Sequence, residues 1–185
     1  MGSLITLRQI DLKRIIAYSS VAHMSVVMIG LFSYYFAGVK GAVYLMFAHG
    51  FASAALFLCI GSVYERHHSR LLAYYGGLSV VMPVLAASFF MFSIANMGFP
   101  GTANFVGEFL CIVGVYKQSI LIAASTATSM ILSAAFTTWL YNRFIFGGLK
   151  TTYIQKFIEV DRKEYLSLRG FCVIVLIMGL IDLYY

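Results

Sequence analysis

Charged side chains are scarce in this sequence. Asp, Glu, Lys and Arg make up 11% of the 185 residues, whereas soluble domains contain roughly 25%. Hydrophobic residues make up 61%, and the mean hydropathy is +0.88. A soluble fold of this size cannot bury so many apolar side chains. The composition therefore excludes a soluble domain and indicates a protein embedded in a membrane.

Long stretches without any charge predict the membrane-crossing helices. They cover residues 15–39, 41–64, 71–107 and 118–142, and a helix needs about 20 apolar residues to cross a bilayer. The runs are continuous, so they do not alternate as the strands of a membrane barrel do. We therefore expect an all-α protein, one membrane domain over residues 1–185 with about six transmembrane helices at approximately 14–37, 41–64, 78–97, 102–117, 119–144 and 168–185.

Glycine, proline and charge mark the expected connections between these helices. Gly38 and Gly41 predict a turn between the first two. The run 98–101 (GFPG) predicts a helix broken near Pro100, because proline removes a backbone donor and transporters use broken helices to present backbone dipoles. An ordinary interhelical loop is the alternative. Eight charges between residues 150 and 169 predict a short interfacial segment within 147–168.

Motifs that bind metals, nucleotides or nucleic acids are missing. Three cysteines, at 59, 111 and 172, lie in separate apolar runs without zinc or disulfide spacing, and the sequence has no Gly-rich phosphate loop or catalytic triad. The net charge of +6 comes largely from basic residues that stand singly at the ends of apolar runs, where snorkelling side chains anchor helices. We therefore expect lipid, and no nucleic acid, as a partner. The first ten residues are too short for a cleavable signal peptide.

Glu108 is the most informative single residue. Of the seven acidic residues, it alone lies well inside an expected transmembrane helix. An ionised carboxylate there costs at least ~2.5–3.5 kcal/mol, so such residues are rare and usually functional. Burial also favours the protonated form, and a carboxyl group that exchanges its proton near neutral pH can both accept and release one. The alternative is a protonated or paired glutamate that only holds helices together.

His23 and His49 form the second candidate group. Each lies about eight residues inside its expected helix, roughly 12 Å from the end, so both are near the middle of a ~30 Å membrane core. Histidine has two ring nitrogens and can pass protons. Structural histidines and a bis-histidine haem pair are the alternatives, and the haem pair leaves Glu108 without a purpose. Further hydroxyl groups lie along the first helix, at Tyr18, Ser19 and Ser20.

Four segments carry a resemblance to a known family. Their order and spacing resemble the subunit 4 family of NADH:ubiquinone oxidoreductase, respiratory complex I. The resemblance is strong over residues 7–115 and weak from 116 onward. Mrp-type sodium/proton antiporters and the chloroplast counterpart share looser versions, and the third segment favours complex I. The segments are 7–24 (LRQIDLKRIIAYSSVAHM), 47–50 (FAHG), 64–70 (YERHHSR) and 98–109, where GFPG is followed by NFVGEF.

The resemblance implies roles for these residues. His23 and His49 match two histidines of the family's central hydrophilic axis, and Glu108 matches the carboxylate on its broken helix, where a proton leaves. Lys13 lies near a helix end and, with the hydroxyls named above, is at most a supporting polar residue. The implied function is proton translocation in the membrane arm of complex I, coupled to NADH:ubiquinone oxidoreduction. The implied cofactors, NADH, FMN, iron–sulfur clusters and ubiquinone, belong to other subunits, so no cofactor is expected in this chain.

The chain also departs from the family pattern. The family's buried lysines lie upstream of the motif at residues 11–14 and have no counterpart here. We therefore expect a second polypeptide that supplies the upstream helices and those lysines, together with other membrane-arm subunits. Split genes of this kind favour the mitochondrial inner membrane over a bacterial plasma membrane. A Mrp-like cation/proton antiporter component and a purely structural membrane subunit remain the alternatives, although the two histidines and Glu108 argue against the structural one.

Overall fold

The computed structural model describes residues 2–148, 150 and 159–181. Within them the chain is helical, and the described part contains no β-strand beyond an isolated bridge between Asp11 and Leu71. The expected all-α membrane fold is confirmed. The helices, in chain order, are α1 (Gly2–Leu7), α2 (Leu12–Leu31), α3 (Phe36–His67), the 3-10 helix η1 (Leu72–Tyr74), α4 (Leu78–Val81), α5 (Pro83–Met97), α6 (Ala103–Tyr116), α7 (Ile120–Ile145) and α8 (Arg162–Ile181).

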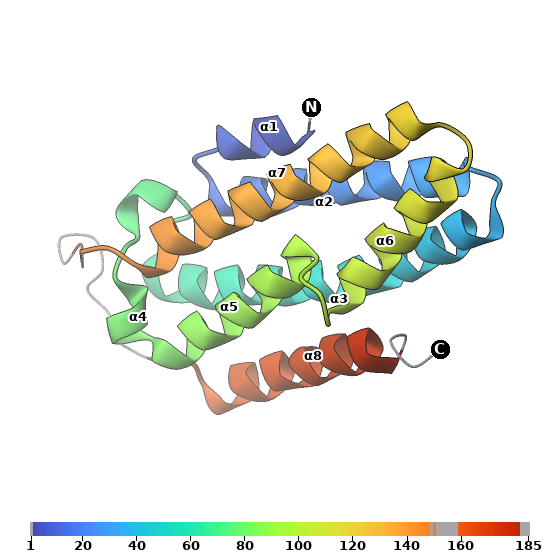
Figure 1. The fold of residues 1–185 in the computed structure, drawn as a ribbon. Coiled ribbons are helices and arrows are strands. Elements are labelled where there is room, and N and C mark those ends of the chain that lie inside the picture. The colour runs from blue at the N-terminus through green and yellow to red at the C-terminus, as the bar shows by residue number, and fades with distance from the viewer. Residues whose placement is uncertain (1, 149, 151–158, 182–185) are drawn as a thin grey trace.

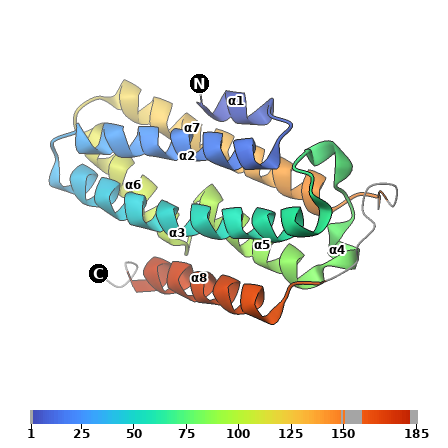
Figure 2. The same cartoon turned by 180° about the vertical axis from the view of Figure 1, so that it is seen from behind.

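Three long helices run the length of the molecule (Figures 1 and 2). Among the described residues, α2, α3 and α7 are long and apolar enough to cross a membrane. The helices α5 and α6 have 15 and 14 residues, so each is roughly 21–23 Å long, less than the ~30 Å hydrocarbon core. They follow one another along α3 and form a discontinuous span. The predicted break near Pro100 is confirmed at residues 98–102.

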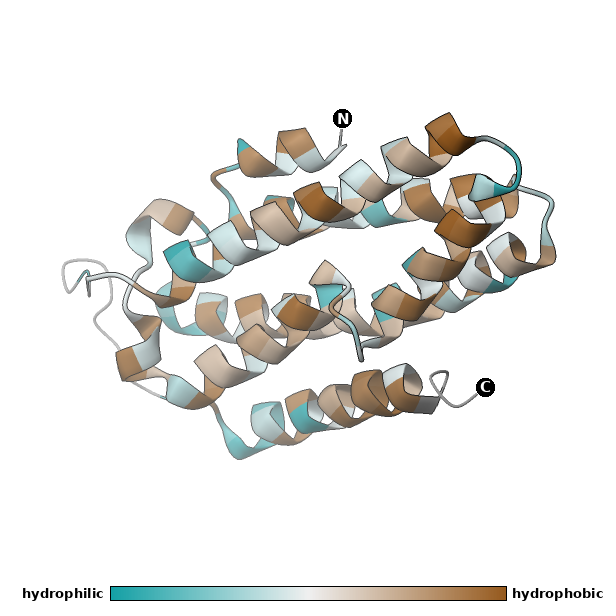
Figure 3. Ribbon diagram, viewed as in Figure 1, coloured by the Kyte–Doolittle hydropathy of each residue, from teal (hydrophilic) through white to brown (hydrophobic). Residues whose placement is uncertain are grey.

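Apolar packing surrounds this discontinuous span. Hydrophobic residues predominate along α5, α6 and α8 (Figure 3). The largest buried cluster joins α2, α3, α5 and α7, and at its centre the Phe89 ring lies 5.1 Å from the Phe144 ring and 6.3 Å from the Tyr141 ring, centroid to centroid. On the other side, α8 covers α3 and the break: Tyr44 donates a hydrogen bond of 2.6 Å to the Met178 carbonyl.

Several expected boundaries differ from the structure. The turn predicted at 38–41 was wrong, because α3 begins at Phe36 and the connection lies at residues 32–35. The expected helix 78–97 is divided into α4 and α5 at Met82, since Pro83 has no N–H to continue the ladder and instead begins α5. The last helix begins at Arg162 rather than 168. Residues 149 and 151–158 of the expected interfacial segment, and 182–185 of the last helix, lie outside the described residues.

Glycines in α3 and α6 explain why the turn expected at residues 38–41 is absent. A Cβ atom on Gly41 would lie 2.9 Å from the Gly107 carbonyl oxygen, and one on Gly107 would lie 2.9 Å from the Leu45 Cα. Two turns further along α6, a Cβ on Gly114 would meet the Gly38 backbone. Small residues of this kind let two membrane helices touch through their backbones. Gly38 and Gly41 therefore serve close helix packing and not a turn.

An ion pair holds the start of α8 to the end of α3. Arg66 donates to Glu164 through Nη1 at 3.0 Å and Nη2 at 2.7 Å, and Nη2 also donates to the Glu159 carbonyl. The guanidinium hydrogen bonds hold the pKa of Glu164 below its usual value. Arg66 and its neighbours Glu65 and His67 belong to α3, which continues beyond the end expected at residue 64.

The close contact between α3 and α6 leads to a stability prediction. Gly41→Ala should destabilise the folded chain by about 1–3 kcal/mol, because the added methyl group overlaps the α6 backbone. Gly61→Ala is the matched control on the same helix, where an added Cβ has nothing within 4 Å. Thermal unfolding of the two variants in mild detergent measures the difference. Equal melting temperatures would show that the helices are not in direct contact.

Candidate functional site

Three titratable side chains from three helices meet in the interior. His23 Nδ1 in α2 lies 2.8 Å from Glu108 Oε1 in α6, and the rings of His23 and His49, the latter in α3, are 4.7 Å apart at their centroids. Their exposed fractions are 3% for His23, 2% for His49 and 1% for Glu108. The structure therefore brings together the three residues that the sequence singled out, in the order His49, His23, Glu108.

Helix periodicity places each of them on an inward face. His23 shares the buried face of α2 with Ser19 and Val26, and Glu108 shares that of α6 with Asn104 and Cys111. These spacings of three and four residues correspond to one side of an α-helix. The backbone contact at Gly41 and Gly107 then holds Glu108, the residue after Gly107, in the interior beside α2 and α3.

The short contact between His23 and Glu108 allows three distributions of protons, because the donor depends on the tautomer and protonation of the imidazole ring. A protonated carboxyl can donate to a neutral imidazole, an imidazolium can donate to the carboxylate, or a neutral imidazole protonated at Nδ1 can donate to the carboxylate. One proton lies between Nδ1 and Oε1 in all three forms, and the pair has no net charge in the first two and a charge of −1 in the third. The hydrogen bond reduces the cost of a buried charge in each case. Moving the proton by a fraction of the 2.8 Å separation interconverts the first two forms.

The site retains further hydrogen-bonding capacity. Buried polar atoms in proteins are usually paired. Four atoms of this cluster have no hydrogen-bond partner among the described residues, namely His23 Nε2, both ring nitrogens of His49 and Glu108 Oε2. Each is therefore able to take or release a proton besides the one shared between His23 and Glu108.

The break between α5 and α6 lies directly against the carboxyl group. Gly98 ends α5 with φ +71°, and a Cβ built on it would be 2.7 Å from Glu108 Oε2. Its amide and that of Phe99 cap the last turn of α5 by donating to the carbonyls of Ala95 and Ile94. Gly98 thus leaves room for Glu108 and ends the helix, two roles that only a glycine combines at low cost.

The other sequence candidates form no hydrogen bond with this cluster among the described contacts. The hydroxyls of Ser19 and Ser20 both donate to the Ile16 carbonyl, and the Tyr18 side chain is 38% exposed. Lys13 is exposed near the start of α2, roughly 15 Å along the helix from His23. The described residues contain no group of three His, Cys, Asp or Glu that could hold a metal ion.

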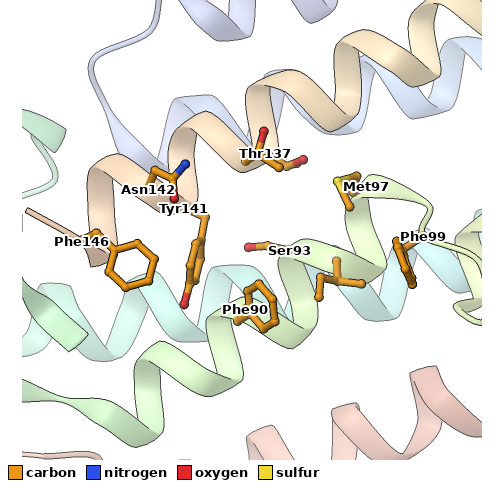
Figure 4. Close-up of a pocket in the computed structure, with 10 residues that line it drawn as sticks. Phe90, Ser93, Met97, Phe99, Thr137, Tyr141, Asn142 and Phe146 are labelled. Carbon is orange, nitrogen blue, oxygen red and sulfur yellow. The ribbon is translucent and has the colours of Figure 1, made fainter. Parts of the chain in front are cut away.

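Sequence reasoning missed the contribution of α7. Ser129 and Ser133 of this helix line a cavity of about 10 Å³ that His23 and Glu108 also border. A larger cavity of about 720 Å³ lies between α5 and α7, where Ser93, Thr137 and Asn142 face it among aromatic side chains (Figure 4). The sequence signal that could have revealed this contribution is the serine and threonine content of residues 125–138. A membrane helix does not need these hydroxyl groups in order to be apolar.

The sequence of this chain matches the model of a known protein family. The family model described as NADH:quinone oxidoreductase/Mrp antiporter, transmembrane, matches residues 1–137. The chain belongs to this antiporter family. The matched region contains α1 to α6 and most of α7, so all three clustered residues lie within the family's own segment.

Curated relatives in the antiporter family are considerably longer than this chain. The proteins named NADH-ubiquinone oxidoreductase chain 4 from Marchantia polymorpha and Chondrus crispus are 51% and 46% identical to it, over 177 and 179 residues. These alignments cover 96% and 97% of this chain and 36% of each relative. The chain therefore spans about a third of the length of these relatives.

Solved structures of the family share the fold. Respiratory complex I from Thermus thermophilus contains a chain that matches with a TM-score of 0.88 and 31% identity, over 100% of this chain and 38% of that chain. The Mrp complex from a Dietzia species matches with a TM-score of 0.86 and 19% identity, over 99% of this chain and 42% of that chain. The second likeness concerns the fold alone.

The glycine at the break leads to a prediction about the site. Gly98→Ala should displace the Glu108 carboxyl and lengthen the His23–Glu108 contact beyond hydrogen-bonding distance, because the new methyl carbon would lie only 2.7 Å from Oε2. Gly101→Ala is the matched control, since Gly101 has φ +95° but open space around its Cβ. Both variants should lose about 1–3 kcal/mol from the positive φ. A structure of each variant measures the distance between His23 Nδ1 and Glu108 Oε1. An unchanged distance of 2.8 Å in Gly98→Ala would contradict the steric argument.

Proposed function

We propose that this chain forms part of a proton-translocating subunit in the membrane arm of respiratory complex I. The observation that carries the proposal is the buried contact of 2.8 Å between His23 Nδ1 and Glu108 Oε1, with the His49 ring 4.7 Å from that of His23. A purely structural role needs one satisfied pair. It does not need a second buried histidine whose ring nitrogens have no partner among the described residues.

Proton transfer in this cluster uses the two nitrogens of His23. A proton that leaves His49 reaches His23 at Nε2, while the proton on Nδ1 passes to Glu108 Oε1. The imidazole then carries the same number of protons as before, and Glu108 holds one more. Because imidazole and carboxyl groups can both accept and release a proton, each group acts in turn as acceptor and donor. Lys13, Tyr18, Ser19 and Ser20 take no direct part in this step.

The comparisons support complex I over an antiporter of the Mrp type. The relatives at 51% and 46% identity are named NADH-ubiquinone oxidoreductase chain 4, whereas the Mrp likeness at 19% identity carries the fold alone. In this assignment NADH, FMN, iron–sulfur clusters and ubiquinone are bound by other subunits, and this chain performs no redox chemistry. NADH oxidation that copurifies with the chain distinguishes complex I from an exchanger of sodium or potassium ions.

The proposed location is the mitochondrial inner membrane. The apolar helices α2, α3 and α7 support a membrane location, and relatives from a liverwort, a red alga and a flowering plant carry the name of a ubiquinone-dependent enzyme. The bacterial plasma membrane is the alternative, since the Thermus structure is 31% identical over the whole chain.

Removal of the titrating carboxyl group tests the proposed function. Glu108→Gln keeps the shape and a hydrogen bond to His23 but cannot exchange a proton, so proton pumping by the assembled complex should fall by about 10²-fold or more. Glu65→Gln, an exposed position on α3, is the control and should pump normally. The measurement is proton translocation into vesicles during NADH oxidation. A Glu108→Gln complex that assembles and pumps like the control would disprove the role.

We further propose that helices bearing buried lysines pack against α2. The exposed stripe of α2 carries Tyr18, Val21, Ser25 and Met28, and polar groups on a membrane helix usually face other helices rather than lipid. The chain also accounts for only 38% of its counterpart in the Thermus complex. These helices, whichever polypeptide carries them, and other membrane-arm subunits would be the partners.

A photo-cross-linking residue at Val21 tests this packing. Val21 is 59% exposed, so in the assembled complex the probe should label a lysine-bearing helix of the same membrane arm. The buried position Ile16 on the same helix is the control and should label only this chain. Labelling of lipid alone at Val21 would show that α2 faces the bilayer and would defeat the proposed partner.

A further inference from the structure

The last helix, α8, packs its backbone against the break between α5 and α6 (Figure 1). Gly179 of α8 is buried. A Cβ atom built on it would lie 2.5 Å from the Gly101 carbonyl oxygen and 2.9 Å from the Ala103 amide nitrogen. A side chain at position 179 would therefore force the two segments apart, since small residues are what let membrane helices touch through their backbones. Any displacement of α8 at this point reaches the break directly.

Contacts on either side of Gly179 fix the position of α8. The Tyr44 hydroxyl in α3 donates to the Met178 carbonyl at 2.6 Å, one residue before Gly179. One turn earlier, Val175 is 4% exposed and packs in a buried cluster with Ala52 of α3 and Ala95 of α5. The hydrogen bond and the apolar cluster together hold the end of α8 against α3 and the end of α5.

The break is loosely packed beside this contact. A cavity of about 210 Å³ is lined by Pro100 and Thr102 of the break and by Cys172 and Leu176 of α8. Side chains do not fill the space here, so the atoms around it lose dispersion contacts that a packed interior would provide. The main-chain contact at Gly179 is thus a close restraint on a segment that has room to move.

The turn at residues 98–102 connects this restraint to the Glu108 carboxyl group. The amide and the hydroxyl of Thr102 both donate to the Phe99 carbonyl, at 3.0 and 2.8 Å, so the turn is closed by its own hydrogen bonds. Gly98, at the start of the turn, is the residue whose Cβ would lie 2.7 Å from Glu108 Oε2. Helix α8 therefore contacts one end of the turn, and Glu108 contacts the other.

We propose that Gly179 and Tyr44 are positioning residues for the proton-transfer cluster. By holding α8 against the break, they keep the Glu108 carboxyl at hydrogen-bonding distance from His23. Neither residue exchanges a proton in the proposed transfer, and each acts through the turn at 98–102. This positioning role rests on the proposed function of Glu108. It gives α8 a part in the transfer, although α8 lies beyond the residues 1–137 that the family model matches.

An added methyl group at position 179 tests this role in the complete complex. Gly179→Ala should lengthen the distance between His23 Nδ1 and Glu108 Oε1 beyond a hydrogen bond, because the methyl group overlaps the backbone of the break. Proton pumping should fall by about tenfold or more, since small misplacements of reacting groups are costly. Gly170→Ala is the matched control on α8, where an added Cβ has nothing within 4 Å. An unchanged distance of 2.8 Å in Gly179→Ala would overturn the positioning role.

A second variant covers the case in which Gly179→Ala fails to assemble. Tyr44→Phe removes the hydrogen bond to Met178 without adding any atom, so pumping should fall in the same direction by a smaller factor. Tyr165→Phe, at a side chain of α8 that is 45% exposed, is its control and should pump normally. The infrared carbonyl band that Glu108→Gln lacks should shift in Tyr44→Phe, because its frequency depends on the hydrogen bond to the carboxyl. A role in stability alone would leave this band in place and would overturn the positioning role.

The positioning role and the proposed function fail in different ways. Normal pumping by Glu108→Gln removes the proposed function itself. Loss of pumping in Glu108→Gln, with normal pumping in assembled Gly179→Ala and Tyr44→Phe, removes only the positioning role.

Discussion

The direct backbone contact between α3 and α6 determines where the polar groups of the site lie. Gly41 and Gly107 bring the two helices so close that a Cβ atom at either position would overlap the opposite backbone. Glu108 follows Gly107 immediately, and the shortness of α6, which begins only after the break at 98–102, leaves its carboxyl beside Gly98. The glycines therefore set the distance between Glu108 and the histidines, although none of them has a side chain to contribute chemistry.

A lone charge in this interior would be costly, and the cluster is arranged to avoid one. His23 and Glu108 share a proton across 2.8 Å, and this hydrogen bond reduces the cost of a charge on either group. The same arrangement is what a proton relay needs, because the pair can accept a proton on one side and release one on the other. Stability and the proposed transfer thus depend on the same hydrogen bond.

Much of this could be predicted from the sequence, and the failures have physical reasons. Glu108 stood out because a carboxylate inside an apolar run is costly wherever its partners lie. Gly38 and Gly41 were misassigned to a turn because glycine serves both turns and close helix contacts, and only the position of α6 distinguishes them. The α7 hydroxyls were missed because a serine that bonds its own helix looks the same in sequence whether it faces a cavity or lipid.

The central claim is that Glu108 gains and loses a proton during turnover. Infrared difference spectroscopy on the assembled complex tests this most directly, since the carbonyl stretch of a protonated carboxyl group is separate from that of a carboxylate. The account predicts a carboxyl band that changes when NADH is added and that is missing from the Glu108→Gln complex. Identical difference spectra for the native and Glu108→Gln complexes would contradict the account, because they would show that this carboxyl keeps one protonation state throughout turnover.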